Sequence, residues 1–562
     1  GAFLQAQELI DVLVATDPQN YVFRRDISYT LERIGDAKQA MGDRDGARAA
    51  YASSLATTEA LAAEYLDDET VRGDLAAGYE RLGDVLIMDG DYESSLAAFG
   101  KSLEIREAFA ALDPDNKLRQ RELAVVFERI GDVNAAKGDL DSALLAFQAS
   151  ATIRERLTAL DPTNMLWQRD LSVALERIGD TLVGQDDLDG ALAAQERALA
   201  LREGIVALDP DILPPQRDVG VSLENVGEVK FNMGDTAGAM EAYVRALDLR
   251  RALFAADPGV YQYGRDLSIS IIRVADLHIA MGDPAAAEPF YAEVVALRAQ
   301  LIGATPDEVA LLRELSYVQM EHVGLLLNLS RPQEALDLAR EMMPVVDRVL
   351  QLAPDVPDNI HDRLVALNRL GDAQTALGDS LGAAASFRDM VAMGNKLLDV
   401  DPYNQVWASD LAVALERLGG ALSAGNDASG ALKSYQDSLA LRDWLVQQDT
   451  TNVFSNLNLA SSYELVSKMF AELEDFQFAL DHQEMSVSIM RDLVAAYPDD
   501  IWYRIDLVRA LDVKGTLLQD PTETNQEALA ILEEMYAQGT LPADYVQWIR
   551  DFRRVLGLPT EI

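Results

Sequence analysis

The sequence of 562 residues contains no cysteine and only four histidines. Without cysteine the chain has no disulfides, no thiolate nucleophile and no cysteine-ligated metal. The histidines are scattered and do not have a metal-binding spacing, and no phosphate-binding glycine motif with lysine is present. We therefore expect no catalytic residue, no cofactor and no metal, and we expect that this chain is not an enzyme. The four histidines are His278, His322, His361 and His482.

Long apolar runs are also missing. No stretch of 18 apolar residues occurs, so we expect no transmembrane helix, and no charged-then-apolar leader is present. Basic residues are scarce, with 48 lysines and arginines against 93 acidic residues and a formal net charge of −45. Such a charge repels nucleic acids and anionic membranes, which are bound through their phosphates. We expect a cytoplasmic protein with neither of these as a partner, and a basic partner is favoured.

The sequence repeats itself every 48 residues. Gly35-Asp36 and Gly83-Asp84 open a series that continues through most of the chain. We call the first glycine of each pair the register glycine. A second Gly-Asp pair follows seven residues later, as in Gly42-Asp43, and many repeats end in Asp-Pro, as in Asp113-Pro114. Repetition at a period of 20 to 50 residues is typical of a solenoid. The register predicts eleven repeats.

Each repeat is predicted to contain two helices and two turns. Glycine accepts a positive φ, aspartate can cap the helix that follows, and proline cannot continue a helix. Between these marks apolar residues recur with helical spacing, and no strand-like alternation competes with it. In the fourth repeat the first helix shows this stripe at Leu171, Leu175, Ile178 and Leu182.

The repeat resembles that of the tetratricopeptide repeat family. That family has an apolar-glycine pair in the first helix, alanine twelve residues after the glycine, an aromatic residue at sixteen and a small residue at nineteen. Alanine occupies the first of these columns in nine repeats, with only Ser95 and Glu527 departing. The match is complete in the fifth repeat, with Val226-Gly227, Ala239, Tyr243 and Ala246.

The repeats are longer than those of the family, in which the usual length is about 34 residues. Both helices have gained seven residues, which is about two turns and returns each apolar stripe to nearly the same face. The resemblance implies an all-α solenoid, a right-handed superhelix of about eleven helix-turn-helix repeats.

Three segments are predicted along the chain. Residues 1–18 resemble the second helix of a truncated preceding repeat, which suggests a piece of a longer protein. Residues 19–520 form the repeat array, and residues 521–562 form capping helices. The array is irregular around 284–360, where Pro289 and Pro344 fall inside predicted helices. Because proline kinks a helix interior, we expect a local bend there.

Acidic residues recur in register. One series lies three residues before the register glycine, another lies one residue after it, and a valine or tyrosine series lies six residues before it. The resemblance implies that these three columns face a concave groove in which extended peptides lie. A further acidic series, nine residues before the glycine, is expected to be structural. The predicted partner-binding residues are Glu80, Asp84, Glu128, Asp132, Glu176, Asp180, Glu224, Glu228, Val125, Val173 and Val221.

Two interpretations of the acidic columns remain open. Like charges at i and i+4, such as Glu176 and Asp180, are destabilising unless something offsets them. An arginine series two residues before the glycine, as at Arg177, could pair with the acid three residues later and could also reach the acid that begins the next repeat's first helix. Alternatively, the carboxylates bind lysine or arginine side chains of a partner.

The sequence therefore predicts a protein-interaction scaffold. We expect it to bind a basic or extended peptide or protein segment in an acidic concave groove. It would then be the docking or sensing arm of a larger signalling or defence protein of bacterial type. The alternative is a regulatory array that controls a linked upstream catalytic domain, such as a protease, a nucleotidase or an NTPase, which this chain does not contain.

Overall fold

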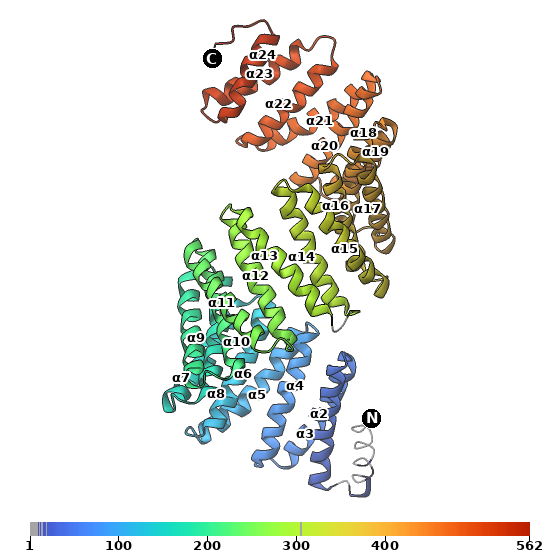
Figure 1. Cartoon of the computed structure of the whole chain (residues 1–562). Coiled ribbons are helices and arrows are strands. Elements are labelled where there is room, and N and C mark those ends of the chain that lie inside the picture. Colours follow the sequence, from blue (N-terminus) through green and yellow to red (C-terminus); the bar gives the residue numbers. More distant parts are fainter. Residues whose placement is uncertain (1–8, 10–11, 13–14, 18, 304–305, 562) are drawn as a thin grey trace. The chain divides into compact units, whose positions relative to one another are not determined.

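The computed structural model describes residues 9, 12, 15–17, 19–303 and 306–561. Across those residues the chain is all-α, and no strand occurs among them. The helices follow one another in pairs, so the predicted α-solenoid of helical repeats is confirmed (Figure 1). The predicted helix at residues 1–18 falls almost entirely outside the described residues.

The first helices of the repeats begin at residues 21, 69, 117 and onward in steps of 48. The second helices keep the same step from residue 44 to residue 476, and the last one begins two residues early, at residue 522. The eleven first helices are α2 (Tyr21–Ala40), α4 (Glu69–Met88), α6 (Lys117–Lys137), α8 (Met165–Gly184), α10 (Leu213–Asn232), α12 (Tyr261–Ala280), α14 (Val309–Asn328), α16 (Pro357–Ala376), α18 (Gln405–Ala424), α20 (Val453–Glu472) and α22 (Ile501–Leu517). The second helices are α3 (Arg44–Glu64), α5 (Tyr92–Leu112), α7 (Leu140–Leu160), α9 (Leu188–Leu208), α11 (Thr236–Ala256), α13 (Pro284–Ile302), α15 (Pro332–Leu352), α17 (Ser380–Val400), α19 (Ala428–Gln448), α21 (Phe476–Ala496) and α23 (Thr522–Ala537).

The chain forms two compact parts, an N-terminal half (Gly1–Leu277) and a C-terminal half (His278–Ile562). In each half, helices that are consecutive in the sequence pack against each other, as α8 does with α7 and α9, and α20 with α19 and α21. Both helices of a repeat are therefore positioned by their immediate neighbours along the chain, which is the packing that defines a solenoid.

The turn between the two helices of a repeat uses the predicted glycine. Gly42, Gly90 and Gly138 have φ values of +78°, +78° and +84°, in the left-handed region. The aspartate that follows caps the second helix: Asp139 accepts a hydrogen bond from the Ser142 amide at 3.1 Å. A glycine at this position ends a helix without steric cost, and aspartate satisfies an amide at the start of the next one.

The register glycine has a different role, because it lies inside the first helix and not in a turn. A Cβ atom on Gly131 would come within 2.5 Å of the Phe147 ring, and one on Gly83 within 2.7 Å of the Phe99 ring. The glycine thus lets the aromatic residue of the second helix lie directly on the backbone of the first. In the seventh repeat the sizes are reversed, since Val323 replaces the glycine and a buried alanine, Ala339, replaces the ring.

The alanine column of the family resemblance lies at the centre of each helix pair. Ala143, Ala191, Ala239 and Ala431 have no exposed surface. Ser95, which departs from alanine in the second repeat, is also fully buried and donates a hydrogen bond to the Gly83 carbonyl at 2.9 Å. These positions are fully buried and hold small side chains, so the column is a packing constraint.

The two internal prolines lie within helices that continue past them. Pro289 is inside α13 and Pro344 is inside α15, both in the C-terminal half. The boundary between the two halves lies elsewhere, between Leu277 and His278 in α12. At the other end of the C-terminal half, a short helix, α24 (Val546–Val555), packs against α23 and buries Ile549 and Phe552.

Replacing Gly131 by alanine should destabilise the N-terminal half. The added methyl group would overlap the Phe147 ring, and overpacking of this kind costs about 1–3 kcal/mol. Gly100 is a matched control, because it also lies inside a helix but a Cβ there meets nothing within 4 Å. Gly100→Ala should raise stability by up to about 1 kcal/mol through helix propensity. Denaturant unfolding measures both, and equal effects would refute the packing role.

Candidate functional site on the first-helix face

The predicted groove residues lie on four successive first helices of the N-terminal half, α4, α6, α8 and α10. Val125, Val173 and Val221 are half-buried, as expected for a face that is partly open to solvent. The predicted groove acids are half-buried as well, except Asp180 and Glu228, which are exposed. We call the surface formed by these residues the first-helix face.

The glutamates three residues before the register glycine are paired with buried arginines. Each arginine comes from the second helix of the same repeat, at a column that the sequence interpretation missed. The Arg202 side chain, 5% exposed, pairs with Glu176. The same pairing joins Arg106 to Glu80 at 3.0 Å, Arg154 to Glu128, Arg250 to Glu224 at 2.7 Å and, in the C-terminal half, Arg442 to Glu416 at 3.1 Å.

Each of these guanidinium groups sits in a polar socket. Arg202 donates hydrogen bonds to the Ser172 hydroxyl at 3.2 Å, the Asp218 carbonyl at 3.1 Å and the Ser222 hydroxyl at 2.8 Å. Ser172 belongs to the same repeat, whereas Asp218 and Ser222 belong to the next. A buried arginine is stable only when charge and hydrogen bonds are both satisfied. The socket provides both, and it ties one repeat to the next.

The glutamate and arginine columns vary along the chain, together in the seventh repeat but separately in the first, sixth and tenth. In the seventh repeat both are apolar, with Met320 at the glutamate position and Val346 at the arginine position, and both are buried. The 48-residue spacing of the arginines was visible in the sequence. What the sequence did not show is that residues 26 apart, such as Glu176 and Arg202, meet across the helix pair.

The acids one residue after the register glycine pair with arginines of the following repeat. Arg177 approaches Asp132 at 3.4 Å, and Arg129 approaches Asp84 at 3.4 Å. The predicted pairing within one helix also occurs, at 3.7 Å between Arg129 and Asp132. Burial nevertheless raises the pKa of Asp84 and of Asp132, with the nearby arginines opposing that rise. In this column the arginines therefore bridge repeats.

The acids nine residues before the glycine have a different partner from the one we considered. The cation comes from the preceding repeat, where it is the residue immediately before that repeat's own acid in this column. The arginine two residues before the glycine does not take part. Arg121 pairs with Asp170 at 2.5 Å, and Arg169 pairs with Asp218 at 2.8 Å. These ion pairs link the starts of successive first helices, as expected for a structural column.

Asp180 is the exception in this arrangement. The residue that should supply its arginine is Asn225, which instead donates a hydrogen bond to Glu176 at 3.1 Å. No ion pair joins Asp180 to a cation among the described residues, and its side-chain hydrogen bond comes from the Gln195 amide at 2.8 Å. Desolvation, with a contribution from the Glu176 carboxylate, raises the pKa of Asp180 to about 6 although its side chain keeps an exposed edge.

The neighbouring acid adds to this local excess of negative charge. Glu228, one repeat further along the same column, is exposed and pairs with Arg273 at 3.3 Å. Its carboxylate also contributes to the raised pKa of Asp180. Asp180 is therefore the predicted groove residue whose charge the fold leaves unmatched, and the missing arginine defines a position that an external cation could take.

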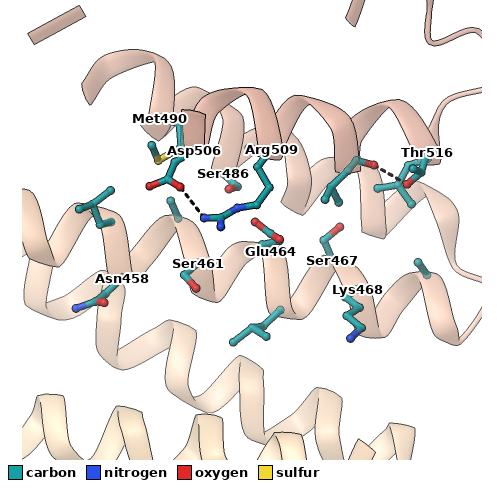
Figure 2. Close-up of a pocket in the computed structure, with 17 residues that line it drawn as sticks. Asn458, Ser461, Glu464, Ser467, Lys468, Ser486, Met490, Asp506, Arg509 and Thr516 are labelled. Atoms are coloured by element: carbon teal, nitrogen blue, oxygen red, sulfur yellow. Dashed lines mark hydrogen bonds and ion pairs between the residues drawn. The ribbon is translucent and has the colours of Figure 1, made fainter. Parts of the chain in front are cut away.

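A second open region lies on the first helices of the C-terminal half. A pocket of about 760 Å³ lies between α20 and α22, with Ser486 and Met490 of α21 also lining it. Figure 2 shows Glu464 and Arg509 on opposite walls, with the Arg509 guanidinium bonded to Asp506 at 2.7 Å. Leu457, Leu465 and Val513 supply apolar lining. The sequence interpretation did not single out this pocket.

Within the described part of the chain no three acidic or histidine side chains gather as metal ligands would. Nor does any helix there combine the length and the apolar character that crossing a bilayer requires.

Comparisons with known proteins give a fold-level likeness only. No protein-family model matches the chain, and neither does any curated protein. Among solved structures, BtubC from P. vanneervenii is 18% identical, with a TM-score of 0.36 over 46% of this chain and 91% of its own. The apo form of RapI is 11% identical, with a TM-score of 0.42 over 75% of this chain and 98% of its own. The helical-repeat fold rests on the chain's own helices, and its finer family stays a prediction.

Replacing Arg202 by methionine should strongly destabilise the N-terminal half. The change leaves the Glu176 carboxylate without its cation, and breaking a buried ion pair costs about 3–5 kcal/mol. The double change Arg202→Met with Glu176→Met should recover much of the loss, because it resembles the apolar pair of the seventh repeat. Denaturant unfolding gives both values, and a double variant no better than the single one would contradict the pairing.

Replacing Asp180 by asparagine should stabilise the chain at neutral pH. An aspartate whose pKa is raised on folding makes the folded state less stable as the pH rises through about 6. An asparagine side chain does not titrate, so Asp180→Asn should melt at a higher temperature than the wild type at pH 7.5. The difference should shrink at pH 4.5, where folded Asp180 is protonated. A pH-independent difference in melting temperature would rule out this titration.

Proposed function

We propose that this chain is a protein-interaction scaffold that binds an extended, basic segment of a partner on the first-helix face of the N-terminal half. Asp180 is the central contact. The observation that carries the proposal is the break in the arginine column at Asn225, which leaves the Asp180 carboxylate without an ion pair among the described residues, although Arg177 lowers its pKa.

The chemistry of the position favours a lysine or arginine side chain. In neighbouring repeats the equivalent carboxylates, Asp84 and Asp132, each accept an arginine at 3.4 Å from the next repeat. A cation from a partner would complete the same contact at Asp180. Charge-assisted hydrogen bonds are about twice as strong as neutral ones, and the carboxylate at Glu228 adds attraction for the same charge.

The surroundings favour an extended segment. Val173 and Val221 are half-buried on α8 and α10 and provide apolar contacts beside the acidic position. An extended peptide presents side chains alternately, so it can place a basic residue at Asp180 and an apolar residue against a valine. The formal net charge of −45 also speeds the approach of a basic segment at low salt.

The proposal is tested with an array of extended dodecapeptides that each carry one lysine or arginine among alanine and valine residues. Binding to wild type should weaken as salt is raised, because the contact is electrostatic. Asp180→Asn should weaken the best peptides by roughly tenfold or more, as expected for a lost hydrogen bond to a charged group. Fluorescence anisotropy supplies the affinities.

Asp84→Asn is the matched control. Asp84 lies in the same column but is already paired with Arg129, so its replacement should leave peptide affinity within about twofold. The proposal fails if Asp84→Asn and Asp180→Asn weaken binding equally, or if neither does.

A further inference from the structure

The tenth repeat keeps the glutamate of the buried ion pair but lacks its arginine. Glu464 lies three residues before the register position, and Met490 occupies the arginine column, 26 residues later. In the seventh repeat the loss of the arginine is matched by loss of the acid, at Val346 and Met320. In the tenth repeat the arginine is lost but the acid remains.

The equivalent of the arginine socket is open in this repeat. The groups that hold the Arg202 guanidinium are Ser172, Glu176, the Asp218 carbonyl and Ser222. Their equivalents in the tenth and eleventh repeats, by the 48-residue register, all line the 760 Å³ pocket together with Met490. These equivalents are Ala460, Glu464, Asp506 and Ala510.

The two serines of the socket have become alanines, which widens it. Glu464 remains, and no hydrogen bond or ion pair joins its carboxylate to another described side chain. Arg509 lies across the pocket, but its guanidinium is bonded to Asp506 at 2.7 Å and its side chain is 60% exposed. Burial raises the pKa of Glu464, and Asp506 adds to that rise while Arg509 and Lys468 oppose it.

We propose that this pocket binds the guanidinium group of an arginine in a partner polypeptide, at the place that the chain's own arginines fill in other repeats. Glu464 accepts the charge, and the Asp506 carbonyl accepts a second hydrogen bond, as the Asp218 carbonyl does from Arg202. Arginine is favoured over lysine because its planar fork can donate to both acceptors at once.

The size and lining of the pocket favour an arginine within a polypeptide. A volume of about 760 Å³ is in the range of ligand pockets and exceeds what one guanidinium requires. Leu457, Leu465 and Val513 offer apolar contacts for the arginine stem and a neighbouring residue, and Lys468 can donate to a backbone carbonyl of the partner. The proposal does not depend on Asp180, which belongs to the other half of the chain.

Binding is tested with three matched probes: the peptide acetyl-Ala-Ala-Arg-Ala-Ala-amide, the same peptide with citrulline, and free L-arginine. Citrulline keeps the shape of arginine but has no charge. The readout is the methyl resonance of Met490 in protein labelled with methyl-¹³C methionine, assigned with a Met490→Leu variant. We expect the arginine peptide to shift this resonance, the citrulline peptide not to, and free arginine to bind no more tightly than the peptide.

Two variants test the site itself. Glu464→Gln should weaken the arginine peptide by roughly tenfold or more, because the charged acceptor is lost. Met490→Arg should supply the missing guanidinium from within the chain, raise the melting temperature and abolish peptide binding. Glu416→Gln is not a suitable control, since Arg442 depends on it. Asp512→Asn is suitable, because Asp512 belongs to the same column but does not line the pocket, and it should bind as wild type does.

Several results would overturn the proposal. Equal binding of the arginine and citrulline peptides, or unchanged affinity in Glu464→Gln, would show that the pocket does not recognise the charge of the guanidinium group. Tighter binding of free arginine than of the peptide would assign the pocket to a small molecule. If the peptide binds Arg509→Ala but not the wild type, Arg509 already fills the socket. Loss of binding in Asp180→Asn with none in Glu464→Gln would favour the N-terminal site alone.

Discussion

The buried guanidinium on the second helix is the interaction on which the arrangement of successive repeats depends. Arg202 joins Glu176 of its own repeat to the Asp218 carbonyl and the Ser222 hydroxyl of the next. A charge taken out of water is tolerated when an opposite charge and hydrogen bonds compensate the lost hydration. The arginine is therefore satisfied only when the next repeat is stacked in register. The arginine recurs from the second to the sixth repeat and again in the ninth, so the requirement holds for these repeats.

The acidic columns contain two kinds of carboxylate, those that are paired with an arginine of the chain and those that are not. Most of their carboxylates are paired with arginines of the same or the next repeat, as the first interpretation of the acidic columns expects. Function is then to be sought where the pairing is broken. Asp180 lacks its arginine because Asn225 replaces it, and Glu464 lacks its arginine because Met490 replaces it. At both positions a partner's cation could form the carboxylate–arginine contact that other repeats form with their own arginine.

Several features could be predicted from residues close together in the sequence. The turn at Gly138 follows from the φ that glycine permits, and the cap at Asp139 follows from the free amides at a helix start. The register glycine required tertiary information. The sequence places Gly131 inside the first helix, but only the structure shows why it is a glycine, because the ring of Phe147 packs on it from the second helix.

The sequence by itself determined the helical class, the length and number of the repeats and the columns that carry charge, because these depend on periodicity and local backbone preferences. Only the tertiary structure decided which charges meet. Residues 26, 45 and 49 positions apart, as in the pairs of Arg202 with Glu176, Arg177 with Asp132 and Arg121 with Asp170, are brought together by stacking. Ion pairing depends on distances of a few ångströms, which periodicity does not specify.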